Sequence, residues 1–338
     1  MSTFVTGLET HQYVAYRKEA ILKAQQEESM WEGTCVPIPL EGKMTSLDAY
    51  GTIEWYAREQ AGEANKVSEI ERDRRWIASS HFANTQRWER TEDHKNLHRF
   101  EPNGFTTRAT LAAWSRLKDG EIWTAFDADV PYGEKGNKLA VYATQVPNNL
   151  IGLEWKESDA ASLAGTGESD TTTVVGAIGD VEVIDTSGGT GVEVGMNLAK
   201  LRKAQQVLLD QDIGGTMLHV ACHSRQINDL LNSSRFTEMD NQSMTSLGVL
   251  GDKLEGMFKG MMWKASTQAT QHTSGYRYVF MYTDRAMVCG KVNGSVDIRL
   301  DELVGNHHMR QLAMYADFGA VRRIDEEVVR IDCKDNWG

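Results

Sequence analysis

The chain has 338 residues, a formal net charge of −12 and a hydrophobic fraction of 41%, which suits one large globular domain or two modest ones. The negative charge argues against nonspecific nucleic-acid binding by the surface as a whole. Cys35, Cys222, Cys289 and Cys333 are scattered, which argues against a zinc site or a disulfide framework and favours a reducing compartment. No apolar run approaches the roughly 18 residues of a membrane span, and the N-terminus lacks the pattern of a signal peptide.

The N-terminal third predicts thin projections rather than a compact domain. Residues 11–26 predict a helix with few apolar side chains, which lies on another surface, either of its own subunit or of a neighbour. Two extended runs, residues 35–40 and 76–82, flank an almost wholly polar stretch at residues 54–75. Loops of this length are usually functional or disordered. We therefore predict a long hairpin whose residues 54–75 lie on an adjacent subunit.

Two further features belong to this third. Pro37 and Pro39 alternate with apolar residues, a pattern that suits a sheet edge or an extended arm, because proline cannot donate to a strand ladder. The charges of residues 87–95 alternate in sign. That alternation is typical of a solvated face, and a charge-matched contact with another subunit is the alternative.

Residues 105–130 predict one long helix around which the chain is organised. Thr106 or Thr107 supplies the N-cap oxygen. Pro131 and Gly133 end the helix.

Apolar side chains occupy most sides of this helix, so we expect a spine with a sheet and loops laid against it. Asp119-Gly120 reads as a weak point inside it, because a mid-helix glycine costs about 1 kcal/mol relative to alanine. The apolar residues are Phe105, Ala109, Leu111, Ala112, Trp114, Leu117, Ile122, Trp123 and Phe126.

The rest of the chain mixes strands and helices without regular βαβ repeats, which indicates an α+β fold with mixed sheets. Residues 196–210 predict an amphipathic helix with Lys200 and two other basic residues opposite its apolar face. Residues 157–191 are rich in Gly, Ser, Thr and Asp and predict turns between short strands or an inserted loop. The chain closes with a hairpin at residues 318–333. Strands are predicted at residues 139–146, 216–222, 258–265 and 276–289, and a short helix at residues 226–231.

The reactive residue types do not form a site with convergent polar groups. Cys222, His223 and Ser224 stand side by side, but no Asp or Asn is placed to orient a base, and triads assemble in space rather than by adjacency. His307 and His308 are neighbours that point apart on a strand or helix. They are interpreted as surface or core histidines rather than as metal ligands.

Three other patterns favour structure over chemistry. Residues 188–191 resemble a phosphate loop only loosely, because no Lys-Ser/Thr follows them. Asp297, Asp301 and Glu302 indicate a solvated acidic edge or a helix start near Asp301. A Met and Trp cluster at residues 257–263 is typical of packing. We therefore predict no catalytic, cofactor-binding or metal-ligating residues, no cofactors and no enzymatic activity.

An ordered set of stretches, rather than one motif, carries a resemblance to a known family. After an arm, an extended loop and the spine helix comes the helix segment 198–204, then a buried strand and the leucine pair of residues 229–232. The stretches that follow are residues 236–240 (Phe-Thr-x-x-Asp), 256–260 (glycine at both ends), 276–289, 319–323 and 328–331. In this order the chain resembles the major capsid protein of tailed bacteriophages, whose fold is shared with encapsulins and the herpesvirus capsid floor.

The resemblance implies the phage major capsid fold, with an arm, an extended loop, a peripheral domain and an axial domain. Residues 157–191 are longer and richer in glycine than a minimal family member needs, and no Lys/Asn pair is assignable to covalent crosslinking. The implied boundaries are arm 1–31, extended loop 32–98, peripheral domain 99–194 and 302–338 with spine helix 105–130, and axial domain 195–301.

The resemblance also implies self-assembly into the hexamers and pentamers of an icosahedral shell around double-stranded phage DNA. The partners would be many copies of the chain, with scaffold, portal and decoration proteins as further candidates and no membrane. The protein would assemble in the host cytoplasm and reside in the virion. A shell subunit must place thin elements against several neighbours, and its rings use head-to-tail contacts. An acidic surface fits a shell that does not clamp its genome.

Three alternatives remain at this stage. An encapsulin-type nanocompartment shares the fold and would hold an enzyme cargo instead of DNA. Another virion structural protein, such as a tail component, also uses arms and long hairpins. A soluble enzyme would use Cys222, His223 or His307, and would show a pocket converging on them.

Overall fold

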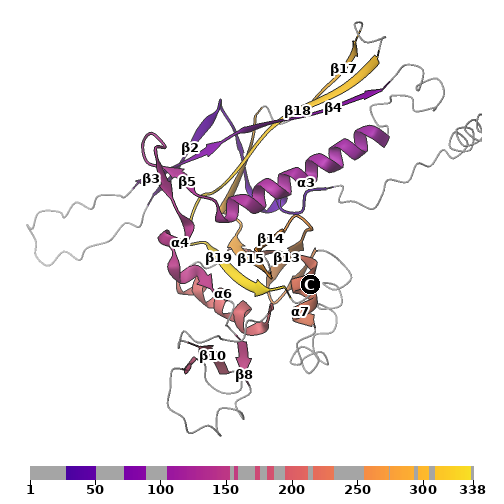
Figure 1. The fold of residues 1–338 in the computed structure, drawn as a ribbon. Helices are drawn as coiled ribbons and strands as arrows, with labels where there is room; N and C mark the ends of the chain where they lie inside the picture. The colour runs from indigo at the N-terminus through magenta and orange to yellow at the C-terminus, as the bar shows by residue number, and fades with distance from the viewer. Residues whose placement is uncertain are drawn as a thin grey trace, which may run out of the picture.

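A long helix, α3 (Phe105–Asp127), runs through the molecule between a strand ribbon and the sheet that contains β15 (Tyr276–Thr283) and β19 (Val328–Lys334) (Figure 1). The strands form four sheets, so the fold is α+β, as predicted. The computed structural model describes residues 28–50, 72–88, 105–152, 156–158, 172–175, 181–185, 195–211, 216–231, 255–273, 275–292, 296–303 and 309–335, and the statements below concern these residues.

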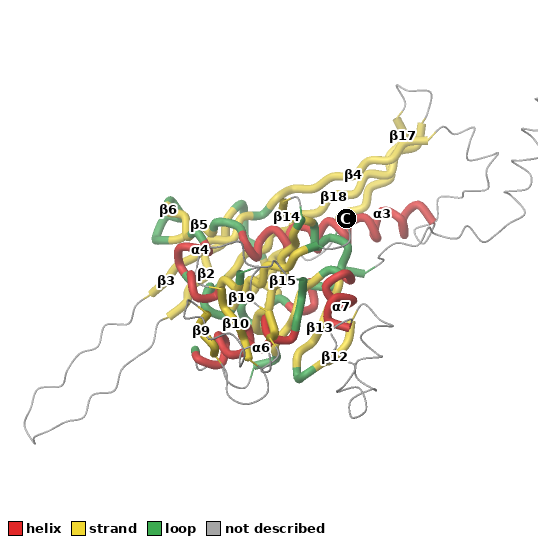
Figure 2. The backbone as a smooth tube through the Cα atoms, turned by 60° about the horizontal axis from the view of Figure 1, so that its bottom comes forward, coloured by secondary structure: helices red, strands yellow, loops and turns green. Residues whose placement is uncertain are grey.

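The strand β18 (Met309–Arg322) organises the sheet that lies over α3 (Figure 2). β4 (Ser80–Trp88) pairs antiparallel along one side of it. On the other side, β17 (Asp297–Leu303) pairs with its first half and β16 (Met287–Lys291) with its second. β1 (Val36–Pro39) pairs in parallel with β16 at the sheet edge, where its prolines predicted it. We call β4, β17 and β18 the ribbon.

The ends of α3 differ from the predicted helix. The helix begins before Thr106 and Thr107, so both lie in its first turn and neither is the N-cap. It ends at Asp127, and Pro131 lies in the next strand, β5 (Val130–Tyr132). A proline fits that strand because β5 is short and lies against the edge strand of its sheet.

Two sides of α3 are covered, as expected of a spine. Ile122 and Phe126 are fully buried in a core cluster that includes Trp31. Trp114 faces the ribbon and meets Phe318 edge-on at 6.1 Å between ring centroids. Leu111 is 38% exposed, so one side of the helix stays open among the described residues.

The strands at the root of the predicted long hairpin are β2 (Met44–Tyr50) and β3 (Arg72–Ala78), which pair antiparallel. β5 and β6 (Lys138–Ala140) complete this sheet. The residues between β2 and β3 lie outside the described part of the chain. Because β3 pairs within its own subunit, the segment predicted to lie on a neighbour narrows from 54–75 to 54–71.

The chain crosses β18 closely where β3 leads into β4 through Ser79. At this crossing a Cβ added to Gly319 would lie 2.3 Å from the carbonyl oxygen of Ala78. Only glycine permits such an approach of two backbones.

The largest sheet has the strand order β12-β13-β11-β15-β19-β7, with β14 beside β15. Its central strand β11 (Leu218–Cys222) is buried, as predicted. The predicted amphipathic helix is α6 (Leu198–Asp210), which shares one core cluster with this sheet and with α7 (Ser224–Leu231). The other strands are β7 (Leu150–Ile151), β12 (Glu255–Phe258), β13 (Met261–Ala265), β14 (Gln271–Thr273), β15 (Tyr276–Thr283) and β19 (Val328–Lys334).

Three segments in the C-terminal part of the chain were each predicted as one strand or one hairpin, and these predictions are wrong. Residues 258–265 are broken by a turn at Lys259-Gly260, where φ is 49° and 75°. Residues 276–289 span β15 and β16, which belong to different sheets. Residues 318–333 do not form a hairpin, because β18 and β19 also belong to different sheets. Apolar alternation predicts which face of a strand is buried, but it does not identify the partner strand.

Residues 139–146 are not a single strand. β6 ends at Ala140, and the short helices α4 (Tyr142–Gln145) and η2 (Pro147–Asn149) follow. The chain turns inward there because Tyr142 is buried and its hydroxyl donates to the carbonyl of Val328 at 2.7 Å. Asp297 and Asp301 lie in β17, so no helix starts there.

Lys200 lies inside the molecule rather than on the solvent face of α6. It is fully buried, and its Nζ donates to the backbone carbonyl of Asp332 at 2.6 Å. Burial lowers the pKa of Lys200, against weaker opposing effects of Cys333, Asp332 and Asp229.

Short strands do occur in the glycine-rich region predicted between residues 157 and 191. β8 (Lys156–Ser158), β10 (Val181–Asp185) and β9 (Thr172–Val175) form a small sheet in that order. The domain boundaries implied by the resemblance remain predictions, and the predicted helix at residues 11–26 lies outside the described residues.

Candidate assembly surface

The ribbon and the N-terminal half of α3 extend away from the other sheets (Figures 1 and 2). The helix packs on one face of the ribbon, where Phe82 lies 5.7 Å from Trp114 between ring centroids. Gln86 Nε2 of β4 donates to Thr110 Oγ1 of α3 at 2.9 Å. A projecting element of this kind exposes much surface for its volume, which suits contact with other molecules.

The opposite face of the ribbon is polar and open. His81 Nδ1 lies 2.7 Å from Asp317 Oδ1, and the His81 ring stacks on Tyr315 at 5.9 Å. The guanidinium of Arg299 lies 5.8 Å from the Tyr315 ring and pairs with Asp297. Exposed pairs of this type add little to stability.

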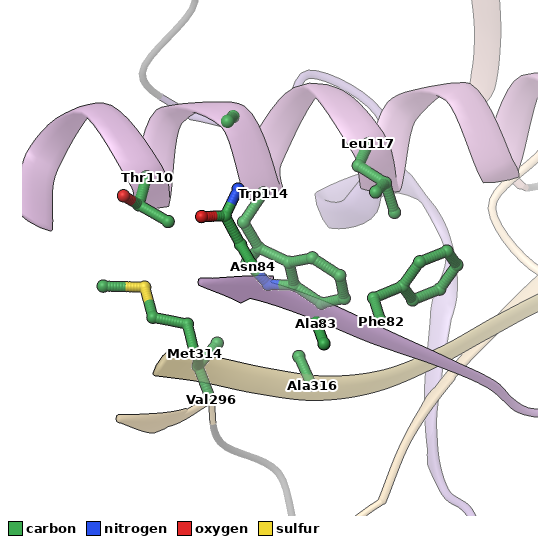
Figure 3. A pocket seen from close by; sticks show the side chains of 10 residues that line it. Phe82, Ala83, Asn84, Thr110, Trp114, Leu117, Val296, Met314 and Ala316 are labelled. Atoms are coloured by element: carbon green, nitrogen blue, oxygen red, sulfur yellow. The ribbon is translucent and has the colours of Figure 1, made fainter. Parts of the chain in front are cut away.

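A small apolar pocket opens between α3 and the ribbon (Figure 3). Its volume is about 110 Å³. Trp114 and Leu117 of α3 line it from one side, and Phe82, Asn84 and Met314 of the ribbon from the other.

The point where the N-terminal segment joins the body is fixed by one buried carboxylate. Asp119, in the middle of α3, is fully buried. It accepts hydrogen bonds from Ser29 Oγ (2.5 Å) and from the backbone N–H groups of Met30 (3.0 Å) and Trp31 (3.2 Å). Trp31 in turn stacks on Trp123 at 5.2 Å. The pair predicted to be a weak point is thus an anchor, and we call Asp119 with residues 29–31 the arm latch.

A second contact secures the same segment. Glu32, in the short helix η1 (Glu32–Thr34), pairs with Lys118 of α3 and with Lys291 of β16. Burial raises the pKa of Glu32, but its hydrogen bonds with both lysines outweigh burial and leave the pKa below its ordinary value.

The root of the long hairpin is fixed by a buried ion cluster. Arg75 of β3 donates both terminal nitrogens to the carboxylate of Asp325, each at 2.8 Å. Arg322 donates to the same carboxylate and, through Nη1, to the carbonyl of Phe126 at 2.6 Å. Its guanidinium lies 4.5 Å from the ring centroid of Tyr142. We call Arg75, Asp325 and Arg322 the hairpin clamp.

The clamp ties the hairpin to the end of α3 and to the turn after β18. Burial raises the pKa of Asp325, but Arg75 and Arg322 outweigh it and the pKa lies below its ordinary value. Arg322 and Asp325 lie three positions apart, but nothing local marks Arg75 as their partner, because Arg75 lies 250 positions before Asp325.

The candidate nucleophile group does not form a catalytic site. Cys222 is fully buried, and burial raises the pKa of its thiol well above the ordinary value. His223 Nδ1 accepts the backbone N–H of Arg225 at 3.2 Å and lies 3.4 Å from Ser224 Oγ. The ring therefore sits at the start of α7 rather than being held as a base by a carboxylate. Burial lowers the pKa of His223.

The other reactive residue types give no site in the part of the chain that the structure describes. No group of three or more His, Cys, Asp or Glu there could hold a metal ion. His307 and His308 lie outside the described residues. No helix in these ranges has the length and hydrophobicity that crossing a bilayer requires. The prediction that the chain has no catalytic, cofactor or metal residues stays a prediction.

Comparison with known proteins gives a consistent result. A family model described as phage capsid protein matches residues 8–335. The search against curated protein sequences returned no match. Among solved structures, the Cyanophage Pam1 capsid is similar with a TM-score of 0.63 and 10% identity, over 95% of this chain and 97% of that one.

Two further solved structures show the same likeness. The capsid of Ralstonia phage GP4 gives a TM-score of 0.63 and 10% identity, over 94% of this chain and 93% of that one. The head of Helicobacter pylori bacteriophage KHP40 gives a TM-score of 0.57 and 11% identity, over 93% of this chain and 92% of that one. At such low identity these likenesses establish the fold, which is that of phage capsids.

Proposed function

We propose, because this chain belongs to the phage capsid protein family, that its copies form the hexamers and pentamers of an icosahedral shell around double-stranded DNA. The observation that carries this proposal is the family match, which runs from residue 8 to residue 335. The chain is a major capsid protein of a phage shell, and it acts in many copies as a component of the virion. Ring geometry, DNA content and assembly in the host cytoplasm are parts of the proposal.

The two buried anchors support this role. A shell subunit must point slender segments at its neighbours, and each segment needs a rigid origin to do so. The arm latch gives such an origin to the residues before Ser29, and the hairpin clamp gives one to the residues between β2 and β3. We propose that residues 1–27 and 54–71 lie on adjacent subunits.

Structural work without catalysis is the second part of the proposal. The thiol of Cys222 is fully buried, and the ring of His223 accepts a backbone hydrogen bond at the start of α7. Neither group is placed to attack a substrate, which supports a role without catalysis. Scaffold, portal and decoration proteins are the further partners that we propose for such a shell.

One expression experiment tests the proposal. The full chain is produced together with the other proteins of a phage genome, so that the proposed partners are present. Particles are purified, and their negative-stain images and their content of nuclease-protected DNA are examined. We expect closed shells of uniform size. A stable monomer without particles would overturn the proposal, and shells filled with one protein cargo would favour the encapsulin alternative.

A deletion then tests the hairpin. Residues 54–71 are replaced by a short Gly-Ser turn, which leaves Arg75 and the clamp in place. We expect a folded, soluble subunit that does not form shells. Normal shells from this variant would contradict the placement of the hairpin on a neighbour.

A further inference from the structure

The pocket between α3 and the ribbon has room for one apolar side chain. Its volume of about 110 Å³ is close to that of an aliphatic side chain. Met314 is 5% exposed at its floor, and Asn84 is an exposed residue whose side chain lies at the pocket (Figure 3). An open apolar hollow of this type gains stability when an apolar group enters it.

The apolar surface continues beside the pocket. Ile298 of β17 pairs directly with Met314 of β18, and directly paired residues share one face of a sheet. Ile298 is therefore on the helix-facing side of the ribbon, yet it is 45% exposed. The apolar face that α3 covers in part thus extends to the rim of the pocket.

The most exposed large apolar side chain among the described residues lies at the other end of α3. Leu139, in the edge strand β6, is 61% exposed. The β5–β6 hairpin that carries it follows the C-terminal end of α3 (Figure 2). Trp114 of the pocket lies in the N-terminal half of α3. Asp127 lies thirteen positions after Trp114 along the helix, about 20 Å at 1.5 Å per residue. A subunit therefore does not fill its own pocket with its own Leu139.

Head-to-tail association joins two different surfaces of identical chains, and it closes into a ring when the rotation permits. The exposed side chain of Leu139, near the C-terminal end of α3, and the apolar pocket beside the N-terminal half of α3 are two such surfaces. We propose that Leu139 of one copy inserts into the pocket between α3 and the ribbon of the next copy around a capsid ring. This inference rests on the proposed function and names the contact that would join its neighbouring subunits.

Cysteine crosslinking tests the contact directly. Leu139→Cys and Asn84→Cys are combined in one chain, assembled under reducing conditions and oxidised with diamide, which takes up the two electrons and two protons of each thiol pair. The native cysteines are all buried. A head-to-tail contact predicts a ladder of covalent oligomers that dithiothreitol collapses to monomer. Mixing the two single variants predicts dimers only, because each chain then carries one half of the contact.

The matched control places the first cysteine at another exposed leucine instead of at Leu139. Leu209 of α6 is 56% exposed, and α6 packs on the largest sheet, whereas β5 and β6 belong to another sheet. Leu209→Cys with Asn84→Cys is expected to give no ladder. If shells form and the Leu139 pair crosslinks no better than the Leu209 pair, the inference is overturned while the proposed function stands. If the unmodified chain forms no shells, the proposed function fails, and the inference fails with it.

A charge substitution covers the case in which the cysteine variant does not assemble. Leu139→Asp would bring an unpaired carboxylate into the apolar pocket, so the yield of particles should fall at least about tenfold. Leu209→Asp should leave that yield unchanged. Equal yields of particles from both variants would overturn the inference, because Leu139 would then be as dispensable as a surface residue elsewhere.

Discussion

Replacing Asp325 by asparagine should be among the most destabilising conservative changes in this protein. The substitution keeps the size of the side chain but removes the charge that neutralises two buried guanidiniums. The side chains of Asp325 and Arg322 are 1% and 0% exposed, and that of Arg75 is 8% exposed. Removing one partner of a buried ion pair costs about 3–5 kcal/mol, because the remaining charge stays in a poorly solvated site. We expect a loss of this size in the free energy of unfolding.

The assay is urea unfolding of the purified protein, followed by the fluorescence of its nine tryptophans. Asp317→Asn is the matched control, because Asp317 pairs with His81, whose side chain is 62% exposed. An exposed pair of this kind is worth at most about 1 kcal/mol. If Asp325→Asn costs no more than the control, the hairpin clamp does not stabilise the subunit and the reasoning is refuted.

Three further predictions concern pH, the arm latch and the crossing of β18. The pKa of Asp325 is lower in the folded protein than in the unfolded chain, where it is about 4. The ion pairs of Asp325 therefore stabilise the fold fully above a pH of about 4. This stabilisation is lost as the pH falls through the folded-state pKa. The melting temperature should therefore drop in acid, and it should drop less in Asp325→Asn; identical pH profiles would count against the clamp. Asp119→Ala should lower the free energy of unfolding by about 1–3 kcal/mol and speed hydrogen exchange at the Trp31 amide. Unchanged exchange at that amide would show that Asp119 does not hold residues 29–31 in place. Gly319→Ala should lower the free energy of unfolding by about 1–3 kcal/mol, because the added methyl group overpacks the crossing. Gly152 has open space around it, so Gly152→Ala should change the midpoint of chemical denaturation little. Equal effects of the two substitutions would refute the close crossing.

Local periodicity predicted the elements whose burial follows from their own residues. The apolar stripe of α6 and the continuous apolar run of β11 predicted a helix and a buried strand where the structure has them. Pro37 and Pro39 predicted an edge strand because proline cannot donate to a ladder. These predictions needed no knowledge of distant parts of the chain.

Partner choice across long sequence separations was not predictable in this way. The alternation of residues 318–333 indicated two strands, but it could not show that β18 and β19 enter different sheets. Lys200 was predicted to lie opposite the apolar face of its helix, but it stands four residues before Ala204 and seven before Val207, which puts it beside that face. Its ammonium reaches a carbonyl of β19 and the side chain is buried.

The anchors were missed for the same reason. The partners of Asp119 lie in the N-terminal segment about 90 positions earlier, and those of Asp325 lie in β3 and at the end of β18. A buried carboxylate in the middle of a helix needs partners to offset its desolvation. Asp119 stands at helical spacing from Ala112, Trp123 and Phe126, on the apolar side of the spine helix. That position was the one sequence signal that could have indicated a latch.

The central claim is that this chain stabilises a shell by placing rigidly rooted segments on other copies of itself. Cryo-electron microscopy of purified particles tests it most directly, because one map shows both the symmetry and the path of each segment. The account predicts fivefold and sixfold rings in which residues 54–71 of each subunit contact the next. Rings whose neighbouring subunits meet without those residues, or particles without such rings, would contradict it.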